Sequence, residues 1–259
     1  IRPRDWSSDV CSSDLVVTKT AMAHALSWKE MVDDYLKMRE GRDGEPFKEF
    51  TFDYDYRLFV DGRPRYQGVE SFLKSRGISI PHGDKEDPAG KETLCGLGNE
   101  KDVRFKRILE EKGIEVYEST VALIKDLRAN RVRVAVASSS KNCQPILKKT
   151  GLEELFEARI DGVVSAQLGL KGKPEGDIFV TAAKHIHCHP DRAVVVEDAV
   201  AGIQAGKKGG FALVVGVARQ DNDQDLKEAG ADIVVNHFRD VDAVIIDHWM
   251  EEKVKRSSR

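Results

Sequence analysis

Between residues 119 and 238 the chain alternates short, continuously apolar runs with longer amphipathic stretches. The apolar runs are rich in β-branched residues and are bounded by turn formers, a pattern typical of strands buried on both faces. The predicted strands are VRVAVA (132–137), ARIDGVVSA (158–166), RAVVVED (192–198), FALVVGVA (211–218) and ADIVVNHF (231–238). The predicted helices are STVALIKDLRANR (119–131), CQPILKKTG (143–151), KPEGDIFVTAAKHI (173–186), AVAGIQAGKKGG (199–210) and DQDLKEAG (223–230). Apolar strands separated by helices predict an α/β fold in which helices cover both faces of a parallel sheet.

The N-terminal half of the chain has a different pattern. Apolar residues recur at helical spacing over 20–40, which predicts an amphipathic helix, and shorter helices are expected over 69–77 and 100–112. Residues 41–68 combine turn formers with many aromatic residues, so a loop or an irregular part of a small domain is expected there. Residues 80–99 are predicted to be a polar connection.

The composition is that of a globular protein with a wet surface: 41% of the 259 residues are apolar and 33% are charged. A net charge of -3 offers no global electrostatic reason to bind nucleic acid or an anionic membrane. No apolar run is long enough to cross a bilayer, and no apolar signal-peptide segment is present, so we expect a cytoplasmic protein without membrane or nucleic-acid partners. The four cysteines are scattered, without CxxC spacing, which predicts reduced thiols.

A serine cluster follows the first of these strands. Ser138, Ser139 and Ser140 lie between the strand and a predicted helix N-terminus. Hydroxyls and free backbone N–H groups converge at such a position, and the helix dipole favours an anion. The cluster therefore predicts a phosphate site, with a serine-rich helix cap that binds nothing as the alternative.

Charged residues stand at two further places on the same predicted edge. Lys173 directly precedes Pro174 at a helix start and can serve as a phosphate counter-charge, although an exposed lysine is the simpler reading and Lys171 competes for the role. Glu197 and Asp198 follow three valines, and adjacent carboxylates suit Mg²⁺, unless Asp198 only caps the next helix. Anion donors, a cation and metal ligands together are the parts that phosphoryl transfer needs.

A second possible metal site is the segment HIHCHPD. Its candidate ligands are His185, His187, Cys188 and His189. They fall at a helix end and in a loop, where adjacent side chains point apart, so incidental histidines are favoured over a zinc site.

Three motifs carry a family resemblance. VAVASSSKN (134–142), GKPEGDIF (172–179) and VVVEDAVAGIQAG (194–206) resemble motifs II, III and IV of the haloacid dehalogenase-like superfamily, and most closely its β-phosphoglucomutase-like subfamily. The resemblance implies a Rossmann-like parallel-sheet core with a mainly helical cap domain inserted after the first strand. The core is then expected to comprise residues 1–22 and 112–259, and the cap residues 23–111.

The first motif of this family departs from its pattern here. The family motif reads F-D-x-D-G-V-[IV]-T-x-T, and the segment VVTKTAMAH sets the register. Ser12 then stands at the position of the nucleophilic Asp, Asp14 at that of the general acid/base, and Leu15 at that of the glycine. The polar DWSSDVCSSD is not expected to form a doubly covered central strand, because it would bury unpaired polar groups. The segment also resembles a translated sequencing adapter, so residues 1–15 are expected to be non-native.

The resemblance also implies roles for individual residues. Ser138 would bind the transferring phosphoryl group, Lys173 would neutralise it, and Glu197 and Asp198 would hold Mg²⁺. The implied substrate-binding residues are Thr20, His24, Lys101, Ser138, Ser139 and Asn142, with Asn99 and Arg65 as weaker candidates. A packed histidine and a solvated lysine are the alternatives for His24 and Lys101.

The implied activity is Mg²⁺-dependent phosphoryl transfer on a small phosphorylated metabolite. A sugar phosphate is expected, acted on by a β-phosphoglucomutase-like mutase or a sugar-phosphate phosphatase, with the enzyme a monomer or a weak homodimer. The alternative is a catalytically dead remnant that still binds phosphate or Mg²⁺, because Ser12 has no charge for the metal and no evident base beside it.

Overall fold

The computed structural model describes residues 9–12, 14–219 and 222–257. By its internal contacts the chain divides into two compact units. Unit 1 comprises the segment up to Lys19 and everything from Glu115 onward, and unit 2 comprises Thr20–Ile114. Unit 2 is thus inserted into the sequence of unit 1.

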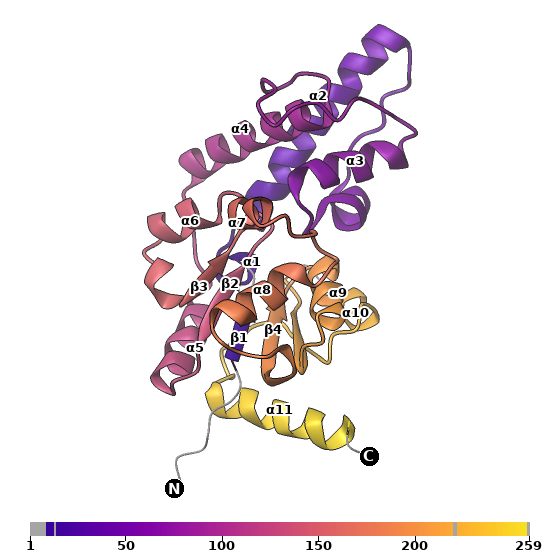
Figure 1. Ribbon diagram of the computed structural model, residues 1–259. Helices are drawn as coiled ribbons and strands as arrows, with labels where there is room; N and C mark the ends of the chain where they lie inside the picture. Colours follow the sequence, from indigo (N-terminus) through magenta and orange to yellow (C-terminus); the bar gives the residue numbers. More distant parts are fainter. Residues whose placement is uncertain (1–8, 13, 220–221, 258–259) are drawn as a thin grey trace, which may run out of the picture. The chain divides into compact units, whose positions relative to one another are not determined.

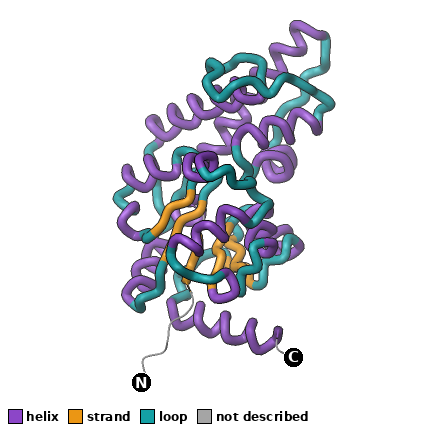
Figure 2. Tube along the Cα trace, viewed as in Figure 1, coloured by secondary structure: helices purple, strands orange, loops and turns teal. Residues whose placement is uncertain are grey.

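Unit 1 is built on a six-stranded sheet with the strand order β3-β2-β1-β4-β5-β6, and each neighbouring pair is parallel. This is the order of a Rossmann fold, which confirms the predicted fold class. The strands are β1 (Asp9–Ser12), β2 (Val134–Ala137), β3 (Ala158–Ile160), β4 (Ala193–Glu197), β5 (Leu213–Val217) and β6 (Ile233–Val235). Figure 2 shows them as one group surrounded by helices.

Two of the expectations for this sheet are wrong. A strand does form at Asp9–Ser12, between β2 and β4, because parallel neighbours on both sides pair with its backbone and Val10 is buried with only 3% of its surface exposed. The predicted strand 158–166 stops at Ile160, because Asp161 accepts hydrogen bonds from Val163 N and Val164 N and so caps a helix.

Helices cover both faces of the sheet (Figure 1). The α-helices of unit 1 are α1 (Asp14–Val17), α5 (Glu118–Ala129), α6 (Cys143–Lys149), α7 (Gly162–Gln167), α8 (Asp177–His185), α9 (Val200–Lys208), α10 (Asp223–Glu228) and α11 (Ala243–Ser257). Two short 3₁₀ helices, η2 (Glu153–Leu155) and η3 (Pro190–Arg192), complete the connections. α5 begins at Glu118 with Tyr117 as its cap residue, two residues before the expected Ser119 cap.

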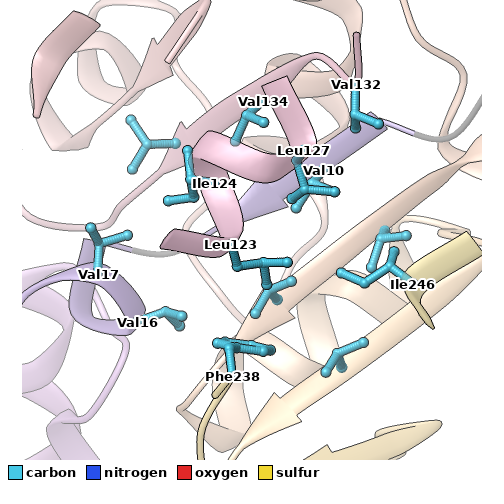
Figure 3. Packing of buried hydrophobic residues seen from close by; sticks show 14 of the residues in the cluster. Val10, Val16, Val17, Leu123, Ile124, Leu127, Val132, Val134, Phe238 and Ile246 are labelled. Carbon is cyan, nitrogen blue, oxygen red and sulfur yellow. The ribbon is translucent and has the colours of Figure 1, made fainter. Parts of the chain in front are cut away.

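Alternate residues along the strands point to opposite faces of the sheet and pack in two separate apolar layers. Val134, Val136, Val194 and Val196 pack on one face with α5, α6 and α11, and Figure 3 shows Val10, Leu127 and Ile246 in this layer. The intervening residues, such as Ala135 and Val195, pack on the other face with α8, α9 and α10. Each fully buried Val, Leu or Ile stabilises the fold by about 1.5–3 kcal/mol. Burial on both faces explains why the strands are continuously apolar.

Unit 2 is mainly helical and has its own apolar core. It contains α2 (Ala21–Asp43), α3 (Arg65–Ser75), α4 (Leu94–Lys112) and a π-helix, η1 (Phe52–Val60). Trp28, Phe50 and Phe72 are at its centre, each at most 4% exposed.

Two parts of unit 2 are more ordered than predicted. The expected loop 41–68 contains η1, because Asp55 accepts hydrogen bonds from Thr51 N and Oγ1 and pairs with Arg76. α4 begins at Leu94 rather than residue 100, because Thr93 Oγ1 accepts a hydrogen bond from Gly96 N at 2.9 Å and caps the helix. Among the described residues, no helix has the length and apolarity required to span a membrane.

Candidate active site

The polar residues singled out in the sequence gather at the carboxyl edge of the sheet in unit 1. β1 and β4 are neighbours at the point where the strand order reverses, and ligands of open α/β sheets bind outside the carboxyl ends of the strands at such a point. Ser138 follows β2 directly, Glu197 ends β4 and Asp198 comes next.

The serine loop after β2 is held in a fixed shape by its own hydrogen bonds. Ser138 is 1% exposed, and its hydroxyl accepts a hydrogen bond from Ser140 N at 3.0 Å. Ser140 Oγ in turn accepts from Asn142 N at 3.1 Å. Gly162 packs directly against this loop, and an added Cβ there would lie 2.6 Å from the carbonyl oxygen of Ser139. The loop therefore has a defined backbone directly before the N-terminus of α6, and the amides of Ser140 and Asn142 are already used to hold it.

Lys173 and Glu197 form a buried ion pair. Both side chains are at most 2% exposed, and Lys173 Nζ donates to Glu197 Oε1. Lys173 Nζ also lies 4.7 Å from the centroid of the Phe179 ring, a cation–π contact. The alternative of an exposed, solvated lysine is therefore wrong, because this ammonium group is enclosed beside a carboxylate.

Both oxygens of the Glu197 carboxylate accept hydrogen bonds from the protein. Its Oε2 accepts hydrogen bonds from Asp198 N at 2.7 Å and Ala199 N at 2.9 Å, while Oε1 accepts from Lys173. The carboxylate also lies over Gly202 in the first turn of α9. Asp198 is 9% exposed, and its carbonyl accepts a hydrogen bond from Asn222 Nδ2 at 3.1 Å. Of the two adjacent carboxylates, Asp198 is the better placed to take a cation directly.

The residues at the first family motif lie at the end of β1. Ser12 is the last residue of the strand and pairs in register with Val136 of β2 and Val196 of β4. Its backbone is therefore level with Val136, two residues before Ser138, and with Val196, one residue before Glu197. The side chains of Ser12, Asp14 and Leu15 lie outside the part of the chain that the structure describes.

The predicted cap residues lie together within unit 2. Lys101 is 5% exposed, and its Nζ is 2.7 Å from His24 Nδ1. His24 stacks on Phe105 with ring centroids 4.0 Å apart, and Lys101 Nζ lies 4.5 Å from the same ring. Burial, aided by the charge of Arg65, lowers the pKa of Lys101 to about 7. Burial and the neighbouring Lys101 also hold the pKa of His24 well below its usual range.

The remaining cap candidates have defined partners. Arg65 pairs with Asp102, whose carboxylate is 3.2 Å from its Nη1. Asn99 donates to the carbonyls of Lys85 and Asp87 and accepts from the Tyr66 hydroxyl, so its side chain ties a loop to two helices. Thr20 directly precedes α2 and is 1% exposed.

A multi-ligand metal site of the kind considered for HIHCHPD needs several protein ligands close together. Among the residues that the structure describes, no group of three or more His, Cys, Asp or Glu side chains is placed to hold a metal ion. In the HIHCHPD segment, His189 Nδ1 instead lies 2.7 Å from Asp191 Oδ1. Mg²⁺ does not need such a cluster, because it usually takes one or two carboxylates together with waters and a substrate phosphate.

The sequence reasoning missed a pair of residues at the same edge. Arg219 follows β5, and its guanidinium carbon lies 3.7 Å from the centroid of the Tyr117 ring. Residues that directly follow strands of a parallel sheet are candidates for the site, and the place of Arg219 after the predicted strand 211–218 could have identified it.

Comparisons with known proteins agree with this geometry. Residues 16–210 match the haloacid dehalogenase-like hydrolase family. A β-phosphoglucomutase of Mycobacterium bovis is 40% identical over 236 residues, which cover 89% of this chain and 90% of that relative. A trehalose-phosphate phosphatase of Mycobacterium leprae is 37% identical over 139 residues, 52% of this chain and 30% of that protein. The crystal structure of a β-phosphoglucomutase from Clostridium difficile has the same fold, with a TM-score of 0.73 at 21% identity over 96% of this chain and 99% of that chain.

Proposed function

Because the chain belongs to the haloacid dehalogenase-like hydrolases, and within them to the β-phosphoglucomutase-like subfamily, we propose that its site is built for Mg²⁺-dependent phosphoryl transfer on a sugar phosphate. The observation that carries the proposal is the convergence of Ser138, Lys173 and Asp198 at one edge of the sheet. These residues supply an anion-binding loop, a buried cation and a metal-binding carboxylate.

Each of these residues has a separate task. The Ser138 loop binds the equatorial oxygens of the phosphoryl group through its hydroxyl and backbone N–H groups. Lys173 supplies a positive charge in an enclosed site where charge interactions are strong, and Glu197 fixes its position. Asp198 holds the metal, and Glu197 orients the turn that carries Asp198 by accepting its N–H. Bound Mg²⁺ would neutralise phosphate charge during transfer.

A sugar phosphate is the favoured substrate class because both named relatives act on such compounds by their names, as β-phosphoglucomutase and trehalose-phosphate phosphatase. A mutase must also bind the distal phosphate of its intermediate, whereas a phosphatase needs only to admit water. Conversion of β-glucose 1-phosphate to glucose 6-phosphate, measured against release of inorganic phosphate, separates the two.

A specific observation favours loss of turnover in this chain. Ser12 ends β1 in register with the other site strands, at the place where the family has its nucleophilic aspartate. A serine hydroxyl adds no negative charge to the metal site, and it is a weak nucleophile without an adjacent base. We therefore propose that the chain binds phosphate and Mg²⁺ but does not form a covalent phosphoenzyme.

Phosphatase assays with p-nitrophenyl phosphate and Mg²⁺ test both parts of this proposal. The chain as it stands is expected to show no Mg²⁺-dependent turnover. Replacement of residues 1–15 by an apolar strand ending in FDLDG is expected to restore it, and the matched control ending in FNLDG is expected to stay inactive. Turnover by the unaltered chain contradicts the loss of the nucleophile. A folded FDLDG variant without turnover contradicts the assignment of the remaining site residues.

A further inference from the structure

The chain passes between its two units through a short ribbon that belongs to unit 1. Thr18 and Val116 form an antiparallel bridge. Lys19 N donates to Glu115 O at 2.8 Å, and Tyr117 N donates to Val17 O at 2.9 Å. The outgoing side of this ribbon, residues 17–19, is the last part of the first family motif, in which Val16 is only two residues beyond Asp14.

Arg219 contacts the chain on both sides of the ribbon. Its Nη2 donates to the carbonyl of Val16 at 3.2 Å and to Thr120 Oγ1 at 3.1 Å. Thr120 Oγ1 itself donates to the same Val16 carbonyl at 3.0 Å. The flat face of the guanidinium stacks on Tyr117, at 3.7 Å from the ring centroid. One side chain from the loop after β5 thus contacts Val16 in α1, Tyr117 on the incoming side of the ribbon and Thr120 in the first turn of α5.

The same loop reaches the metal-binding position. Asn222 donates to the carbonyl of Asp198 at 3.1 Å. Burial raises the pKa of Tyr117 and lowers that of Arg219, and the negative charge of Asp198 is a smaller influence on both groups. Asn222, three residues after Arg219 in the sequence, thus contacts the backbone of Asp198, while Arg219 itself contacts Val16 and Tyr117.

Arginine suits these contacts because it combines hydrogen-bond donors with a planar face that stacks on an aromatic ring. Its planar fork can donate in several directions while its face stacks on an aromatic ring, whereas a lysine ammonium is a point charge that cannot stack in this way. Arg219 Nε is buried and donates no hydrogen bond within the described part of the chain, a condition that costs stability. The side chain therefore adopts a position that contacts Val16 and Tyr117 but leaves Nε without a hydrogen-bond acceptor among the described residues.

We propose that Arg219 is a positioning residue for phosphoryl transfer, which fixes the backbone after the first motif relative to Asp198 by holding Val16 and Tyr117. The proposal rests on the proposed function for its catalytic consequence, while the fixing of the ribbon is a property of this chain as it stands. Arg219 then holds the motif that carries positions 12 and 14 from its C-terminal side, although Arg219 lies 203 residues beyond Val16 in the sequence.

Hydrogen exchange of the unaltered chain tests the fixing of the ribbon. In Arg219→Gln, the amides of Lys19 and Tyr117 are expected to exchange at least about 10-fold faster, because their cross-ribbon bonds open locally, while amides in β4 and β5 keep their rates. Arg219→Lys is expected to behave like Arg219→Gln. Tyr117→Leu removes the ring on which the guanidinium stacks and so tests the same contact from its other partner. The matched control is Arg192→Gln, an exposed arginine before β4. Unchanged exchange at Lys19 and Tyr117 in Arg219→Gln overturns the proposal.

Kinetics in the FDLDG variant test the catalytic consequence. Arg219→Gln is expected to lower kcat by about 100-fold, the effect of a misplacement of about 1 Å, with KM changed by less than about 3-fold. Arg192→Gln is expected to leave both constants unchanged. If the FDLDG variant itself has no turnover, the proposed function fails while the exchange experiment still decides on the ribbon. If the variant turns over and Arg219→Gln does not slow it, the positioning role fails while the function stands.

Discussion

The carboxylate of Glu197 occupies the space in which a side chain at residue 202 would have to lie. An added Cβ on Gly202 would overlap Cδ and Oε1 of Glu197. The same Oε1 accepts from Lys173, and Oε2 accepts from the amides of Asp198 and Ala199. The missing side chain of Gly202 therefore allows the first turn of α9 to lie against the buried ion pair, and this explains the glycine in the motif ED-x-x-AGI.

Substitution of Gly202 by alanine is expected to displace Glu197 and weaken its bond to Lys173. The fold has to shift or bury a strained ion pair, so the free energy of unfolding is expected to fall by about 1–3 kcal/mol, measured by urea denaturation. Gly41→Ala is the matched control, because Gly41 is also helical and nothing lies within 4 Å of an added Cβ. That control is expected to gain about 0.5–1 kcal/mol. Equal effects at the two positions contradict the steric argument.

Removal of one member of the buried ion pair is expected to be severe. Lys173→Met leaves the carboxylate of Glu197 enclosed without its cation, and a loss of about 3–5 kcal/mol in the free energy of unfolding is expected. Addition of Glu197→Gln is expected to recover part of this loss, because the uncompensated charge disappears. Lys208→Met breaks the pair with Glu175, in which both side chains are about half exposed, and is expected to cost at most about 1 kcal/mol. Additive effects of the two substitutions at Lys173 and Glu197 contradict direct coupling.

The sequence pattern predicts the valine-rich strands well because burial on both faces imposes a continuous apolar run. It fails for β1, since the pairing partners of Asp9–Ser12 are β2 and β4, which come more than a hundred residues later and override local composition. It also fails after Ile160, where the apolar residues of 162–167 read as a continued strand. The local signal there is Asp161, whose side chain caps α7.

The candidate site is predictable where one residue follows one strand, as for Ser138 and Asp198. The partnership of Lys173 with Glu197 is not, because both adjacent carboxylates read alike as metal ligands until the geometry shows one of them engaged with a lysine and two amides. Arg219 is harder still, because its contacts with Val16 and Tyr117 depend on the course of three separate segments.

Gly162→Ala is expected to weaken phosphate binding at the serine loop. The added Cβ would lie 2.6 Å from Ser139 O and 2.9 Å from Lys141 N, so the loop backbone that carries Ser138 has to move. We expect at least about a 10-fold loss in affinity for inorganic phosphate, about 1.4 kcal/mol, by calorimetry in the presence of Mg²⁺. Gly41→Ala is again the control and is expected to bind phosphate as the unaltered chain does. Unchanged affinity in Gly162→Ala argues that phosphate does not contact this loop.

The buried Lys101 is expected to make the stability of the chain depend on pH. Its pKa falls from 10.5 in the unfolded chain to about 7 in the folded one, so between these values the unfolded state holds the extra proton. The free energy of unfolding is then expected to rise with pH across this window, by up to about 1.4 kcal/mol per pH unit from this group. The lowered pKa of His24 acts in the same direction but below pH 6.5, so urea denaturation between pH 7.5 and 9.5 excludes the contribution of His24.

Lys101→Met is expected to flatten the pH dependence in this range, because no group is left that gains a proton on unfolding at this position. Lys106→Met, on the same helix with a side chain 60% exposed, is the matched control and is expected to keep the slope of the unaltered chain. A slope that persists in Lys101→Met would mean that Lys101 stays protonated in the folded chain. The contact with His24 Nδ1 would then be an ammonium donating to a neutral imidazole.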